Sequence, residues 1–147
     1  MSHNWILAVA LAALSFFALG GLWYTVLFGQ PWRKEMGITD DQAQGGSPMM
    51  MQFVWSILIS LVIAFTLSKL IGEAGTSYGL KVGAGTGAGI GAAVMAQNNV
   101  YESKSLRFFA INAAYVVVGL AIMGAVIGVV QGTGLRTAPL TCMADFR

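Results

Sequence analysis

The chain has 147 residues, of which 56% are hydrophobic and 10% are charged, and its formal net charge at pH 7 is +2. This composition lies well outside the range of soluble globular domains and indicates a membrane protein. It also leaves too little polar sequence for a separate soluble domain.

The charged residues cluster between long uncharged runs. About 20 apolar residues are needed to cross a hydrocarbon core about 30 Å thick. Four runs are long enough, and they cover residues 5–28, 48–70, 80–100 and 108–130. We therefore predict an all-α, polytopic membrane protein whose four transmembrane helices form two hairpins within residues 1–130. Residues 131–147 are expected to form an extramembrane C-terminal tail.

The first run is expected to be a retained helix rather than a cleaved signal peptide. No Lys or Arg precedes Arg33, and the run exceeds the apolar stretch of about 7 to 15 residues that is typical of signal peptides. Trp and Tyr favour the membrane–water boundary, so those near the ends of the runs are predicted interfacial anchors. These anchors are Trp5, Trp23, Tyr24, Trp32 and Tyr101.

The connection after the first run has an amphipathic beginning and ends in Gly-Gly-Ser-Pro. Thr39 and Gln42 resemble a weak capping box, which allows one short interfacial helical turn. The simpler interpretation is a solvated loop that Trp32 holds to the lipid headgroups. Ser47 and Pro48 are typical of a helix start, with Ser as N-cap and Pro at the first helical position.

The third run is rich in glycine, and three interpretations compete for it. A nucleotide-binding loop needs a preceding strand and a soluble helix after it, which this apolar run does not provide. A polar linker would not carry the Ala, Val, Ile and Met residues that fill the other positions. Glycines four residues apart instead predict a helix that contacts other helices closely, because small residues let backbones approach in lipid.

These predicted packing residues form two faces on the third helix and one on the fourth. On the third helix, one face comprises Gly83, Gly87 and Gly91, and the other comprises Gly85 and Gly89. On the fourth helix, the face comprises Gly124 and Gly128. We expect a tight hairpin of the last two helices, with the third helix at the centre of the bundle. The alternative is that one glycine face stays free for another protomer.

Polar side chains gather where the third helix ends and the fourth begins. This candidate polar cluster consists of Gln97, Asn98, Asn99, Glu102, Arg107 and Asn112. One interpretation is closure of the hairpin, with a loop ion pair between Glu102 and Lys104 or Arg107 that contributes little energy. The other is a polar path for a ligand or ion, since ionisable residues within membranes are commonly functional.

Catalysis and cofactor binding are not indicated by the residues. His3 and Cys142 are the single His and the single Cys, and both lie outside the four runs. The runs therefore offer no His or Cys ligand for a haem or a metal. We predict no catalytic residues, no metal site and no cofactor.

Several stretches resemble an uncharacterised bacterial membrane family, domain of unknown function 1761. They are LGGLWYTVLFGQPWRKEMGIT at residues 19–39, QFVWSILIS in the second run, NNVYESKSLRFFAINAAY at residues 98–115 and IMGAVIG near the end of the fourth run. The resemblance covers about residues 4–130. A Phe-Glu-Gly type of turn is common in such families where this chain has Tyr101-Glu102-Ser103. The resemblance implies a small four-helix membrane protein and brings no established activity.

The residues together predict a non-catalytic, multi-pass protein of the bacterial inner (cell) membrane. We expect it to pack against other membrane subunits as an accessory or structural component of a larger complex. The alternative is a small-molecule or ion transporter or channel that acts as an oligomer. Expected partners are membrane lipids and other membrane subunits or further copies of the chain, without nucleic acid. Four Lys and Arg residues fall on each side of the predicted membrane, and their distances from the helix ends favour loops one and three in the cytoplasm, with both termini outside.

Overall fold

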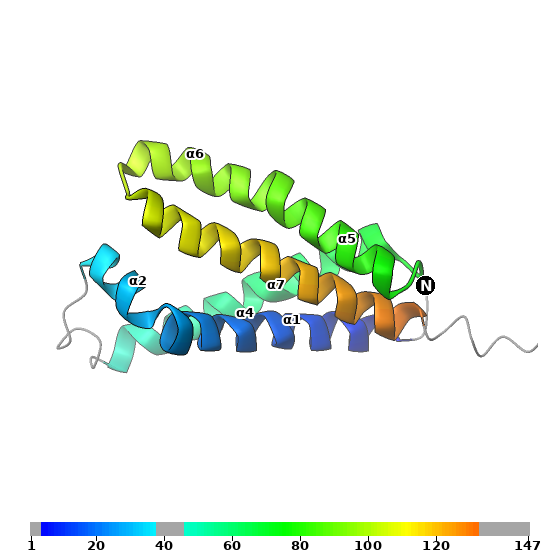
Figure 1. Cartoon of the computed structure of the whole chain (residues 1–147). Coiled ribbons are helices and arrows are strands. Elements are labelled where there is room, and N and C mark those ends of the chain that lie inside the picture. The colour runs from blue at the N-terminus through cyan, green and yellow to red at the C-terminus, as the bar shows by residue number, and fades with distance from the viewer. Residues whose placement is uncertain (1–3, 38–45, 133–147) are drawn as a thin grey trace, which may run out of the picture.

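The computed structural model describes residues 4–37 and 46–132, and every regular element in these two ranges is a helix (Figure 1). In chain order these elements are α1 (Trp5–Leu22), the π-helix η1 (Trp23–Leu27), α2 (Gly29–Met36), α4 (Gly46–Ile71), α5 (Thr76–Thr86), the π-helix η2 (Gly87–Gly91), α6 (Ala92–Glu102) and α7 (Leu106–Gly132). His3, Cys142, the Thr39 and Gln42 capping box and nearly all of the predicted tail lie outside the described residues.

Three helices in the described ranges are long and apolar enough to cross a membrane: Trp5–Leu27, Met51–Ile71 and Leu106–Gly132. These three helices support the assignment to the membrane class. The continuous stretch α5–η2–α6 holds the third predicted run but is not among them. Its six glycines contribute little hydropathy and so lower the mean hydropathy of the helix. The structure therefore has three helices of this kind, where the sequence predicted four.

Two predicted details of the first connection differ from the structure. Residues 29–36 form α2, where we had predicted a loop, and Gly37 ends this helix in the left-handed conformation that glycine adopts easily (φ 67°). Helix α4 begins at Gly46, so Ser47 is not its N-cap. Pro48 lies in the first turn of α4, where its missing N–H disrupts no helical hydrogen bond.

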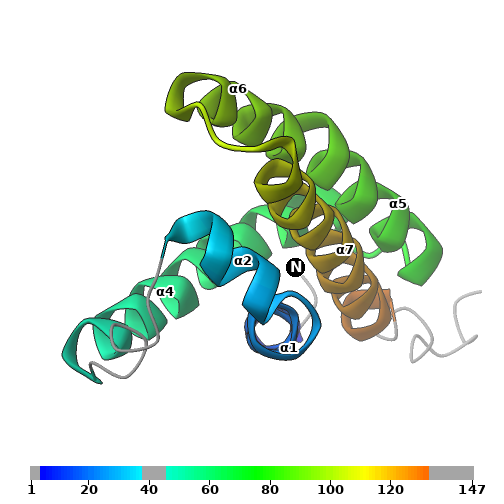
Figure 2. The ribbon, with the colours of Figure 1, turned by 60° about the vertical axis from the view of Figure 1, so that its left-hand side comes forward.

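Helix α7 is the centre of the bundle (Figure 1). The α5–η2–α6 helix packs on one side of it and α1 on the other, while α4 contacts α1 along much of its length and contacts α7 less extensively. Figure 2 shows the N-terminal end of α4 leaning away from the other helices. The prediction that the third helix is central was wrong, because one of its glycine faces has no helix against it.

The bundle divides into two halves along its length. The packed half comprises residues 5–16, 60–71, 75–91 and 119–132, and the open half comprises residues 17–36, 51–59 and 92–118. The hydrophobic core lies in the packed half, where its buried members are Val9, Ala12, Ala13, Phe16, Ala64, Leu67, Ile71, Leu120, Met123 and Ile127. In the open half, every residue from 51 to 59 is exposed and α6 has no buried residue.

Candidate functional site

Glycines hold α5 against α7 at backbone contact. Gly79 faces Gly124 and Gly83 faces Leu120, and a Cβ added to any of these three glycines would collide with the carbonyl oxygen opposite. Each step of four residues toward the C-terminus on the α5 side matches a step of three or four residues back along α7, as expected for antiparallel helices. The same series includes Gly75 with Gly128 and Gly87 with Val117. Such close approach maximises van der Waals contact, which stabilises helix pairs in lipid. We call this series the glycine ladder.

The glycine ladder loosens as η2 leads into α6. A Cβ on Gly87 would still lie 2.9 Å from the Cα of Val117, which is backbone. A Cβ on Gly91 would meet the side chain of Val116 first, at 2.5 Å, and no α7 backbone atom is among its three nearest neighbours. The next position on the same side, Met95, carries a large side chain and lines a cavity against α7. The change from glycine to bulky residues therefore marks the border between the packed and the open half.

The second predicted glycine face has no neighbour. Gly85 and Gly89 are exposed, and a Cβ added to either would have no atom of the described residues within 4 Å. Ala93 is exposed four residues further on and extends this face by one helical turn. We call Gly85, Gly89 and Ala93 the open glycine face.

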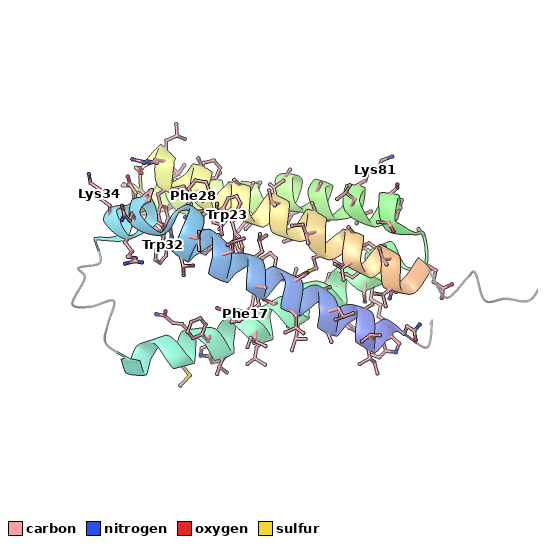
Figure 3. All side chains as sticks on the ribbon, turned by 60° about the horizontal axis from the view of Figure 1, so that its bottom comes forward. Phe17, Trp23, Phe28, Trp32, Lys34 and Lys81 are labelled. Carbon is pink, nitrogen blue, oxygen red and sulfur yellow. The ribbon has the colours of Figure 1, made fainter. Side chains whose placement is uncertain are left out.

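Aromatic side chains join α1 to α7 in the open half. Two consecutive residues of the π-helix η1 reach α7, since the Trp23 Nε1 donates to the backbone oxygen of Ile111 (3.2 Å) and the Tyr24 hydroxyl donates to Asn112 Oδ1 (2.7 Å). The rings of Trp23 and Phe28 lie with their centroids 4.8 Å apart, and Figure 3 shows both near Trp32. Trp23 and Tyr24, which we predicted to be interfacial anchors, thus also bridge two helices.

The other predicted anchors have different surroundings. The Trp5 ring lies edge-on to Phe65, with centroids 6.1 Å apart, and the Lys69 ammonium lies 5.5 Å from the Trp5 centroid. Tyr101 is 80% exposed at the end of α6. Trp32 extends from α2 toward α7 and lines a cavity there.

Four members of the candidate polar cluster surround that cavity, which has a volume of about 250 Å³. Its walls combine amides, a carboxylate, a thioether and aromatic rings, contributed by Trp32, Met95, Asn98, Asn99, Glu102, Phe108, Phe109 and Asn112. Gln97 and Arg107 are exposed and do not line it. We call this space the polar cavity. The structure therefore brings together four of the six predicted residues.

Asn99 closes the hairpin between α6 and α7. Its Nδ2 donates to the backbone oxygen of Lys104 (3.1 Å) across the turn, in which Ser103 has a positive φ of 51°. Asn99 Oδ1 is buried and accepts no hydrogen bond from the residues that the structure describes. Within the described ranges, Glu102 forms no ion pair with Lys104 or Arg107, so the loop ion pair that we had considered is absent there.

Ser105 fixes the start of α7 and connects it to α2. Its hydroxyl accepts a hydrogen bond from the backbone N–H of Phe108 (3.1 Å), the N-cap contact that satisfies an otherwise unpaired donor. The same hydroxyl donates to the carboxylate of Glu35. Our sequence reasoning missed this residue, although a Ser immediately before a long apolar run is a typical N-cap signal.

A second cavity, of about 410 Å³, lies between α1 and α4 where the two helices diverge. Most of its wall is aromatic or aliphatic, with the side chains of Phe16, Phe17, Tyr24, Trp32, Phe53 and Tyr115 among its lining residues. Trp32 lines this cavity and the polar cavity. The hydrogen bond from Tyr24 to Asn112 connects a residue of one cavity wall to a residue of the other. The two spaces are therefore neighbours.

In residues 4–37 and 46–132, no group of three or more His, Cys, Asp or Glu side chains is placed to hold a metal ion. The chemistry of the open half is therefore that of amides, hydroxyls, aromatic rings and single charges.

The chain belongs to a family described as protein of unknown function (DUF1761), whose model matches residues 7–128. This match confirms the resemblance noted from the sequence. No curated protein and no solved structure matches the chain.

Proposed function

We propose that the chain is a non-catalytic membrane protein that packs against another membrane subunit through its open glycine face. The observation that carries this proposal is the contrast between the two glycine faces of one helix. Gly83 on the first face lies against the α7 backbone, whereas Gly85 and Gly89 on the second face have no neighbour within the described part of the chain. Small residues at this spacing are the usual contact surface of membrane helices.

A lipid-facing helix has little use for such a surface. Glycine lowers helix stability by about 1 kcal/mol relative to alanine in a helix interior. Close packing against a second helix offsets that cost, and lipid tails offer no comparable contact. Gly85 and Gly89 therefore suit a partner helix better than they suit lipid.

Part of the proposal is that α5–η2–α6 is the fourth transmembrane helix. It runs without a break from Thr76 to Glu102, and at 1.5 Å per residue a helix of this length exceeds the hydrocarbon thickness of about 30 Å. Its packing along α7, itself a candidate span, supports this topology.

We further propose that the protein resides in a bacterial cell membrane, with loops one and three in the cytoplasm. Lys34 and Lys81 lie at opposite ends of the bundle (Figure 3). Ser105 in loop three contacts Glu35 near loop one, so these loops share an end. The Arg and Lys residues of that end, near the helix termini, support the assignment by the positive-inside rule.

The test is the mobility of the solubilised particle on native gels after replacement of the open glycine face. We expect Gly85→Leu with Gly89→Leu to release the chain from its complex, because two isobutyl groups would hold the partner helix away. Ala18→Leu is the matched control, since Ala18 is exposed on a different helix.

The proposal requires a smaller particle for the double variant and an unchanged particle for Ala18→Leu. An unchanged particle for both variants would contradict it. Circular dichroism of the purified double variant checks that its helices remain folded.

The alternative function, transport by an oligomer, rests on the two neighbouring cavities of the open half. Asn99, Glu102 and Asn112 line the polar cavity, and Tyr24 connects it to the larger cavity between α1 and α4. Transport predicts a flux across liposomes that falls in Glu102→Gln and Asn99→Ala. A flux that is equal in the native chain, Glu102→Gln and Asn99→Ala would remove this alternative.

A further inference from the structure

Asn99, a residue of the polar cavity wall, carries a buried acceptor that the described part of the protein does not satisfy. Among residues 4–37 and 46–132, Asn99 Oδ1 has no hydrogen-bond donor, while Nδ2 of the same amide donates to the backbone oxygen of Lys104. An unpaired buried acceptor of this kind usually costs about 1–3 kcal/mol. A group that donates an N–H or O–H to this oxygen would remove that cost once the Asn99 side chain turns the oxygen toward the cavity.

The neighbouring amide in the cavity is already satisfied. Asn112 Oδ1 accepts from the Tyr24 hydroxyl, and Asn112 Nδ2 donates to the backbone oxygen of Phe108 (2.9 Å). The unsatisfied atom is therefore the Asn99 oxygen, which accepts a hydrogen bond from an N–H or O–H group. Glu102 at the cavity rim adds a carboxylate, which within the described part of the chain has no ion-pair partner.

The rest of the wall favours a cation. Trp32, Phe108 and Phe109 line the cavity, and aromatic faces attract a cation within about 6 Å of the ring centroid. The Lys104 ammonium already lies 5.8 Å from the centroid of Phe108, so Trp32 and Phe109 are the rings that remain for a ligand. Lys104 and Arg107 are both exposed and do not line the cavity.

We propose that the polar cavity binds a primary ammonium group. Such a group combines a positive charge for Glu102 and the rings with N–H donors for Asn99 Oδ1. A quaternary ammonium has no N–H and leaves that oxygen unsatisfied. The volume of about 250 Å³ accommodates a small amine. The proposal is independent of the proposed function, since no residue of the open glycine face lines the cavity.

Two sources carry this chemistry: the headgroup of phosphatidylethanolamine and a free amine such as ethanolamine. For the lipid, the full-length protein is exchanged into bilayers with equal amounts of phosphatidylethanolamine and phosphatidylcholine, and the lipids it retains are counted by native mass spectrometry. For the free amine, the protein in bilayers of phosphatidylcholine and phosphatidylglycerol is titrated with ethanolamine or choline, and Trp fluorescence is followed.

Glu102→Gln is the informative variant, and Glu73→Gln is its control because Glu73 is an exposed carboxylate in the turn after α4. We expect Glu102→Gln to weaken the preference for the primary amine about tenfold, as the loss of one charged hydrogen bond implies, and Glu73→Gln to leave it unchanged. If only Glu102→Gln weakens the retention of phosphatidylethanolamine, the cavity is a lipid headgroup site. If only Glu102→Gln weakens the binding of ethanolamine and the protein shows no preference between the two lipids, the cavity is a free-amine site. Equal binding of choline and ethanolamine compounds, or equal losses in both variants, would overturn the proposal.

Discussion

The packed and open halves are built from the same helices, yet they differ in how closely those helices approach. In the packed half, α5 and α7 meet at their backbones because glycines face each other, as Gly79 faces Gly124. In the open half, α6 and α7 carry Met95 and Asn112 at the corresponding positions and enclose a cavity of about 250 Å³. The size of the side chain along one seam thus determines whether the helix pair closes or leaves space.

A similar contrast applies to α4. Its C-terminal half contributes Ala64, Leu67 and Ile71 to the core, while all residues from 51 to 59 are exposed. Stability therefore comes mainly from one half of the bundle, which leaves the other half available for a ligand or a partner. Matched substitutions in the two halves test this division.

The largest effect is expected for Gly83→Ala, in the glycine ladder. The added methyl group would collide with the Leu120 carbonyl oxygen, and overpacking of this kind costs about 1–3 kcal/mol. The measurement is the free energy of unfolding in mixed micelles, followed by circular dichroism. Gly85→Ala, two residues away on the open glycine face, is the control and should lose no stability. Equal losses for the two variants would show that the two faces are not different.

A smaller effect is expected where aromatic residues bridge α1 and α7. Tyr24→Phe removes the hydroxyl that donates to Asn112 Oδ1 and should lower the free energy of unfolding by about 1 kcal/mol, which lies within the range for hydrogen bonds between membrane helices. Tyr101→Phe is the control, because Tyr101 is 80% exposed. If Tyr24→Phe is as stable as the native chain, the hydrogen bond from Tyr24 to Asn112 contributes nothing to the free energy of unfolding.

Ser105→Ala should lower the stability by about 0.5–1 kcal/mol, because α7 loses its N-cap. The substitution also removes the contact with Glu35, so α2 should exchange amide hydrogens faster. Hydrogen exchange followed by mass spectrometry measures this effect on peptides from residues 29–36. Ser77→Ala, at an exposed position in α5, serves as control. Unchanged exchange in α2 would argue against the link between α2 and α7.

The smallest effect is expected in the open half of α4. Val54 is 49% exposed, whereas Val9 in the core is 8% exposed. Val54→Ala should change the free energy of unfolding by less than about 0.5 kcal/mol, as exposed substitutions usually do, while Val9→Ala should cost more because it removes buried contacts. A large loss for Val54→Ala would place residues 51–59 in a stabilising contact within the isolated chain.

The sequence allowed the membrane class to be predicted, because uncharged apolar runs of about 20 residues are typical of helices that cross a bilayer. It also pointed to close helix contacts, because glycines recur every four residues in the third run. It could not distinguish Gly83 from Gly85, since both belong to series with the same spacing. That distinction depends on which face α7 approaches, and this is determined by the antiparallel register of the two helices.

The candidate site was predictable only in part, because it also depends on which elements approach each other in the folded chain. Asn99 and Glu102 are close in sequence to the turn, so a shared location with Asn112 followed from the hairpin. Trp32 reaches this site from α2, an element that we had predicted as a loop. No local pattern indicates a contact of this kind, because it depends on the path of the chain after η1.

The most direct test of the proposed packing role is the mass and composition of the native particle, solubilised from the source membrane in a mild detergent. The open glycine face predicts a particle larger than one chain, with a second subunit or a second copy present in constant ratio. A particle that contains a single chain and only lipid and detergent would contradict the proposed role.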